Sequence, residues 1–140
     1  MISLNLAQQL KKAGLVWQTS INDFFGLPDR DMDERVFVLT NMQTQTDLFK
    51  GWPVITFHGA SEWALDYILT TEAIWLPTES QLRQALMALC SNENECSVQL
   101  FQSRQETVCT VTTASGPVNF RGSDGAEAYG LALLHFLSET

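Results

Sequence analysis

The chain has 140 residues, of which 45% are hydrophobic, and its 16 acidic and 8 basic residues give a formal net charge of −8. A chain of this length and hydrophobicity can bury a core without metal or disulfide support, and we expect one domain over residues 1–140. The charge disfavours binding to nucleic acid and to anionic membranes, because both depend on clustered Lys and Arg. It suits a basic protein partner.

The cysteine pattern and the absence of targeting signals bear on the compartment. Cys90, Cys96 and Cys109 are an odd number at irregular spacing, which favours three free thiols over a disulfide framework. No secretory signal is visible, and no apolar run approaches the ~20 residues of a membrane-spanning helix. We therefore expect a cytoplasmic protein with reduced cysteines.

The first segments alternate between a helix and loops. Ser3–Ala13 has helical periodicity with a capping serine, and Gly14 ends it. Asp23–Pro28 mixes aromatic residues with helix breakers and is predicted to be a loop that packs on the core. Asp29–Arg35 is the densest charge run and is interpreted as a solvated loop.

The central stretch predicts two strands and a helix. Val36–Thr40 and Val54–His58 are rich in β-branched and aromatic residues, and the second is apolar on both faces, which is typical of a central strand. A helix is expected from Ser61, with Tyr67 and Ile68 on its apolar face. Ala73–Leu76 either finishes this helix or forms a small strand.

The second half has clearer signals. Thr78 and Gln81 have the spacing of a capping box before an apolar helical stripe. A hairpin is expected across Ser103–Glu106, followed by a third strand. Asp124 begins a last helix that is apolar on most of its circumference. The expected fold class is α+β, a single-layer, mainly antiparallel sheet packed by helices, with an α-β-β-β-α second half.

That order resembles the double-stranded-RNA-binding domain in outline. The family uses a basic run at the start of its last helix to hold phosphates. Here the matching segment, Asp124–Glu127, is acidic. The resemblance therefore implies a packing arrangement and no RNA binding.

Four segments, Phe57–Gly59, Glu62–Tyr67, Trp75–Glu79 and Glu127–Tyr129, resemble those of small uncharacterised bacterial cytosolic proteins. The similarity covers most of the chain. It implies a bacterial cytosolic origin and no particular activity. Such proteins sometimes carry a pilus-assembly label, but no phosphate-binding glycine loop is present to support an ATPase of that kind.

The candidate ligand site is the strand-to-helix turn Phe57–Glu62. His58 would end a central strand, and ligand sites in open sheets often lie at such ends. Glu62 would orient the imidazole, and Trp63 would supply an apolar wall. The alternative is that His58 only hydrogen-bonds at a helix terminus. No catalytic residue, metal ligand or cofactor is indicated.

Two functions follow from these patterns. The first is a non-enzymatic protein-interaction or regulatory protein, favoured by the charge and the surplus of apolar helix surface. The alternative is a small ligand-binding protein or enzyme with its site at Phe57–Glu62. A homo-oligomer, most simply a dimer, is also expected, because the apolar last helix would leave a face for another subunit.

Overall fold

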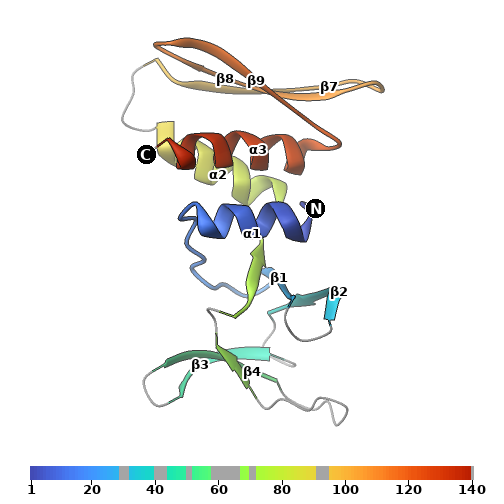
Figure 1. Cartoon of the computed structure of the whole chain (residues 1–140), viewed down its shortest axis with the longest axis vertical. Coiled ribbons are helices and arrows are strands. Elements are labelled where there is room, and N and C mark those ends of the chain that lie inside the picture. Colours follow the sequence, from blue (N-terminus) through green and yellow to red (C-terminus); the bar gives the residue numbers. More distant parts are fainter. Residues whose placement is uncertain are drawn as a thin grey trace. The chain divides into compact units, whose positions relative to one another are not determined.

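A computed structural model describes residues 1–28, 32–39, 44–49, 52–57, 67–69, 72–90 and 95–139 (Figure 1). The chain divides into two compact units. Unit 1 comprises Met1–Leu15 and Pro77–Thr140, and unit 2 comprises Val16–Leu76. One cooperative domain over residues 1–140 stays a prediction.

The first two helices of unit 1 begin where their capping residues predict. Helix α1 (Leu4–Lys12) follows Ser3, whose hydroxyl accepts a hydrogen bond of 3.1 Å from the backbone N–H of Leu6. Helix α2 (Glu79–Cys90) follows a reciprocal capping box. The Thr78 backbone N–H donates to Gln81 Oε1 over 2.9 Å, and the Gln81 N–H donates to Thr78 Oγ1 over 3.2 Å.

Helix α3 (Gly125–Ser138) lies at the centre of unit 1, between the sheet and the other two helices (Figure 1). Asp124 caps it by accepting a hydrogen bond of 2.8 Å from the Glu127 N–H. A Cβ at Gly130 would stand 2.8 Å from Leu6 Cδ2, so a glycine there lets α1 approach closely. None of its large apolar side chains is fully exposed, but Leu131, Leu134, Phe136 and Leu137 are only half-buried. A dimer through this helix stays a prediction.

The sheet of unit 1 has three antiparallel strands in the order β7-β8-β9. Strand β7 (Ser97–Gln102) pairs with β8 (Thr107–Thr113) across the predicted hairpin, and β8 pairs with β9 (Gly116–Gly122). Alternate β8 residues face the helices, among them Cys109 and Val111, which are buried. The predicted α-β-β-β-α second half is confirmed.

Unit 2 contains two further three-stranded antiparallel sheets. In the first, β1 (Phe24–Leu27) lies between β2 (Met32–Val38) and β6 (Ile74–Leu76). The second has the order β3-β4-β5. Its strands are β3 (Thr44–Phe49), β4 (Trp52–Phe57) and β5 (Tyr67–Leu69).

The α+β class and the antiparallel pairing are confirmed, but the strands of the described ranges lie in three separate sheets and not in one shared by both halves. Phe24–Leu27 is a strand and not the predicted loop. Met32–Arg35, from the predicted charged loop, belongs to β2. Tyr67–Leu69 is a strand paired with β4, where a helix was predicted. Strand β4 is central, as expected.

Aromatic packing organises the core of unit 2. Phe25 and Leu27 are buried in a cluster with Leu39 and Ala73. The ring of Phe25 lies 5.7 Å from that of Trp17 and 5.5 Å from that of Phe37, measured between ring centroids. Such contacts add to the hydrophobic stabilisation of the buried aromatic residue. They explain why a segment with Gly26 in it nevertheless holds a strand.

Candidate functional site

Unit 1 contains a pocket of about 250 Å³ where α2 and α3 end and β7 begins. Most of its wall is apolar, and the two cysteines of a disulfide are among its lining residues. Its lining residues are Leu86, Leu89, Cys90, Cys96, Val111, Thr113, Phe136 and Glu139.

The α2 side of the pocket follows from helical periodicity. The capping box fixes where α2 begins, and residues four apart then fall on one face. Leu82, Leu86 and Cys90 have this spacing and are all buried. Leu89, one residue earlier than Cys90, lines the pocket but is 39% exposed, so it forms part of the mouth.

Cys90 and Cys96 form a disulfide with an Sγ–Sγ distance of 2.09 Å and a Cα–Cα distance of 5.5 Å. It joins the end of α2 to the residue before β7. The prediction of three free thiols is therefore wrong. An odd number of cysteines excludes only complete pairing, and a helix end and a strand start six residues apart can be brought within bridging distance by the fold.

The third cysteine, Cys109, is free and fully buried on β8. Burial raises the pKa of its thiol from 9.0 to about 11. The thiol is therefore protonated at neutral pH. Because the thiolate is the nucleophilic form, Cys109 is unsuited to nucleophilic chemistry there.

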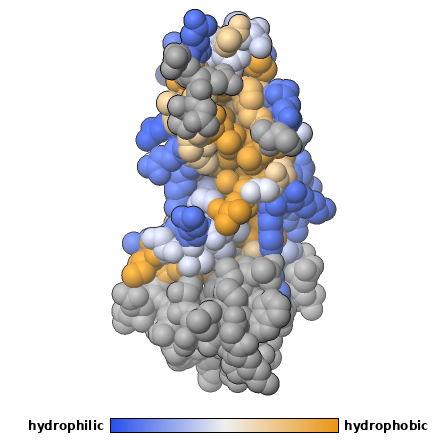
Figure 2. Space-filling model, turned by 90° about the vertical axis from the view of Figure 1, so that its left-hand side faces the viewer, coloured by the Kyte–Doolittle hydropathy of each residue, from blue (hydrophilic) through white to orange (hydrophobic). Residues whose placement is uncertain are grey.

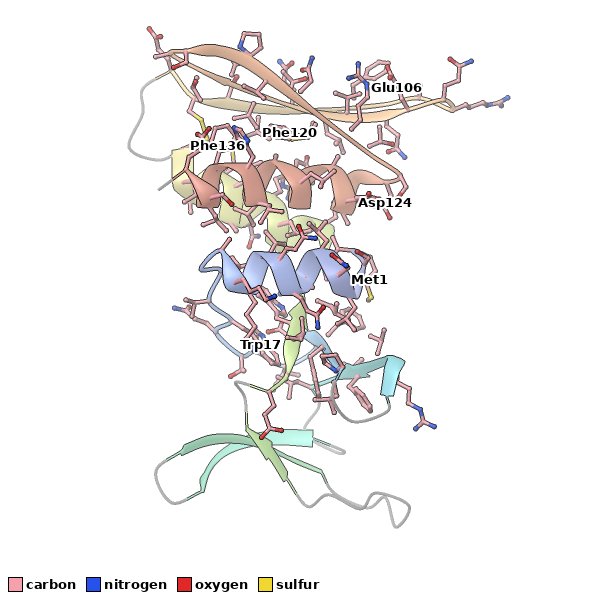
Figure 3. The ribbon with its side chains drawn as sticks, viewed as in Figure 1. Met1, Trp17, Glu106, Phe120, Asp124 and Phe136 are labelled. Carbon is pink, nitrogen blue, oxygen red and sulfur yellow. A yellow bond between two sulfur atoms is a disulfide. The ribbon has the colours of Figure 1, made fainter. Side chains whose placement is uncertain are left out.

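An aromatic cluster lies beside the pocket, where the ring of Phe136 on α3 is 6.0 Å from that of Phe120 on β9, measured between centroids (Figure 3). The ring of His135 lies 5.3 Å from that of Phe120 and 5.0 Å from that of Phe136. His135 Nε2 lies 3.0 Å from Glu139 Oε1, one helical turn further along. His135 is exposed and not a core residue. His135 therefore contacts both Phe136, which lines the pocket, and the carboxylate of Glu139.

The rim of the pocket is acidic. Glu139 lines the pocket and is exposed, and Glu95 is exposed next to Cys96. The last turn of α2 contains no basic residue. In the described ranges, the pocket lining itself includes no Lys or Arg.

The predicted site residues His58, Glu62 and Trp63 lie outside the described residues. Strand β4 ends at Phe57, the first residue of the predicted turn. Within the described ranges, no group of three or more His, Cys, Asp or Glu side chains is placed to hold a metal ion. No helix in the same ranges is long and apolar enough to cross a bilayer.

Sequence reasoning missed the pocket, although part of its signal is present. Cys90 continues the spacing of Leu82 and Leu86 by one more step of four, which places it on the buried face of α2. The strand after Cys96 was also predicted. The approach of Phe136 and Val111 to that helix end depends on tertiary packing, which no local pattern encodes.

No protein-family model matches the sequence, and comparison with curated proteins and with solved structures finds no match either.

Proposed function

We propose that this protein is a non-enzymatic interaction protein, and that the pocket between the ends of α2 and α3 receives an apolar side chain from a basic segment of another protein. The observation that carries the proposal is the pocket of about 250 Å³ with a mainly apolar wall and an acidic rim. This volume is below the ~300–1,000 Å³ usual for small-molecule sites, and it suits a single anchoring side chain.

The polar groups in the wall already have partners. Thr113 Oγ1 accepts a hydrogen bond of 3.2 Å from the Ser115 N–H, and Glu139 pairs with His135. Among the described residues, the one buried side-chain polar atom without a partner is Trp75 Nε1, which belongs to unit 2. A polar small molecule would therefore find few unpaired groups here, whereas an apolar side chain needs none.

Apolar surface reaches the mouth of the pocket. Leu89 on α2 lines the pocket and is 39% exposed. The face at the C-terminal ends of α2 and α3 is turned to the viewer in Figure 2, where unit 1 presents hydrophobic surface bordered by hydrophilic side chains. Such bordered patches are typical of protein-binding surfaces.

The acidic rim supports a cationic partner segment. Glu139 lines the pocket and is exposed, Glu95 is exposed next to the lining residue Cys96, and the net charge of the chain is −8. Charge of this sign accelerates encounter with a basic segment and disfavours an acidic one. The affinity itself would come from the buried apolar anchor.

A peptide-display experiment tests this proposal. Random twelve-residue peptides are selected on the wild-type protein, and binding is measured by fluorescence anisotropy. We expect selected peptides to combine one large apolar residue with Lys or Arg. Replacing Leu89→Ser should weaken their binding about tenfold, which corresponds to the loss of part of one apolar contact. The matched control is Met87→Ser on the same helix, which should retain binding because Met87 does not line the pocket.

Two results would contradict the proposal. One is a peptide pool that shows no preference for basic and apolar residues. The other is equal binding by the Leu89→Ser and Met87→Ser proteins. The alternative function, a ligand site at Phe57–Glu62, stays a separate hypothesis, and His58→Ala is its test.

A further inference from the structure

Strand β7 forms an open edge of the unit 1 sheet. It pairs with β8 along all six of its residues without a bulge, and among the described strands none lies on its other side. In the part of the chain that the structure describes, no residue forms a backbone hydrogen bond to that outer side. Such an edge is a template for pairing with another strand.

Proteins usually protect an open edge with charges, proline or a bulge. The opposite edge strand, β9, has two such residues, Pro117 and Arg121. Strand β7 has the sequence SVQLFQ and has neither. Its Phe101 is 58% exposed on the sheet face that points away from the helices. Within the unit 1 sheet, β7 is therefore the unprotected edge.

The hairpin closure shows which backbone groups face outward. Ser103 N–H donates to the Glu106 carbonyl over 2.8 Å, so these two residues form a hydrogen-bonded pair. In an antiparallel ladder, hydrogen-bonded and non-hydrogen-bonded pairs alternate. Residues 97, 99 and 101 therefore bond to β8, and the backbone groups of Val98, Leu100 and Gln102 point to the open side.

We propose that β7 pairs antiparallel with β7 of a second copy of this chain, which joins the two three-stranded sheets into one of six strands. The outward-pointing backbone N–H and C=O groups of the two strands pair best when Leu100 of one copy lies opposite Leu100 of the other. Val98 of each copy then lies opposite Gln102 of the other. The twofold axis is then perpendicular to the sheet, and Gln99 of one copy stands beside Phe101 of the other. The second copy then covers apolar surface that is exposed on Phe101 and on the half-buried Leu100 of the first.

The charges of Glu95 and Arg104, at the two ends of β7, favour pairing with a second copy of β7 over pairing with an unrelated strand. In the proposed register, Arg104 of one copy lies level with Cys96 of the other, and therefore next to Glu95. By symmetry the same pair forms at both ends. Glu95 and Arg104 are both exposed in the single chain. The strand itself adds no charge that would repel its own copy.

Sedimentation equilibrium over a wide concentration range tests the proposal. We expect a species of twice the 15.7 kDa mass of one chain. The double variant Gln99→Lys/Phe101→Lys changes two exposed residues and places like charges opposite each other, so its dimer dissociation constant should rise by about a hundredfold. The control, Pro117→Lys/Asn119→Lys, adds the same charge on β9 and should dimerise like the wild type.

Charge reversal tests the register. Glu95→Arg should weaken the dimer by about tenfold, because it places two arginines at each end. Adding Arg104→Glu to that variant should restore the dimer. Hydrogen exchange gives an independent readout: the amides of Val98 and Leu100 should be protected only in the dimer, and those of Gln99 and Phe101 in both states.

Three outcomes would overturn the proposal. The first is a monomer at every concentration, in which case the edge is free or serves another protein. The second is a dimer that the β7 and β9 double variants affect equally. The third is a dimer in which the amides of Val98 and Leu100 exchange as fast as in the monomer.

Discussion

The indole Nε1 of Trp17 donates a hydrogen bond of 2.8 Å to Oδ2 of Asp23, a carboxylate that is only 3% exposed. The same oxygen accepts a hydrogen bond of 2.9 Å from the backbone N–H of Ser20. Asp23 therefore ties the turn before β1 to an aromatic side chain that packs on Phe25. A buried carboxylate with two donors is a structural requirement of unit 2.

Replacing Asp23→Ala should lower the free energy of unfolding by about 2 kcal/mol, because it leaves two donors without an acceptor. Urea unfolding followed by tryptophan fluorescence measures this change. Asp23→Asn keeps an oxygen acceptor and should cost less than half as much. Equal stability of the alanine variant and the wild type would show that Trp17 and Ser20 find other partners.

The disulfide makes a prediction about labelling and stability. Without reductant, the denatured protein should take one alkyl group, on Cys109, and after reduction it should take three. Reduction should also lower the free energy of unfolding by about 2 kcal/mol, since the short loop is no longer constrained in the unfolded chain. The Cys90→Ala/Cys96→Ala protein should be insensitive to reductant. Three labels without reductant would mean that the bridge does not form in solution.

Signals that act over three or four residues were predicted well. The capping residues Ser3 and Asp124 mark the starts of α1 and α3, and Thr78 with Gln81 marks α2. The hairpin at Ser103–Glu106 was also found, because its flanking strands alternate in polarity. In each case the hydrogen bonds that fix the structure lie within the segment itself.

Segments whose conformation depends on distant partners were predicted poorly. Gly26 and Pro28 made Phe24–Leu27 look like a loop, yet pairing with β2 and β6 and the burial of Phe25 make it a strand. Tyr67–Leu69 has helical spacing but pairs with β4. The pocket likewise depends on α2, β8 and α3 meeting, and the predicted His58 site lies outside the described residues.

The capping box lies at the start of α2, the helix whose last residues line the pocket, and it predicts an effect on stability. Thr78→Ala removes the acceptor of the Gln81 N–H and should cost about 1 kcal/mol of unfolding free energy. Thr78→Ser retains the hydroxyl and should restore most of it. Thermal unfolding followed by circular dichroism compares the three proteins. If alanine and serine behave alike, the hydrogen bond of 3.2 Å to Thr78 Oγ1 contributes nothing measurable.

Burial of Cys109 predicts a loss of stability at alkaline pH. Its pKa is raised to about 11 in the folded protein, above the 9.0 of an unburied thiol. Below pH 9 both states are protonated, so the stabilisation is fully present. As the pH rises from 9 towards 11, the unfolded chain loses the proton while the folded protein keeps it, and stability should fall by about 2 kcal/mol in total.

The comparison that isolates this effect uses the Cys90→Ala/Cys96→Ala background, in which no disulfide can exchange with a thiolate. Urea unfolding is measured between pH 8 and 10.5 with and without the further change Cys109→Ala. The protein that retains Cys109 should lose stability more steeply above pH 9, although Cys109→Ala lowers stability at every pH by leaving a small cavity. Parallel pH profiles would show that Cys109 ionises as easily in the folded protein as in the unfolded chain, and that the buried thiol at the centre of β8 is accessible to solvent.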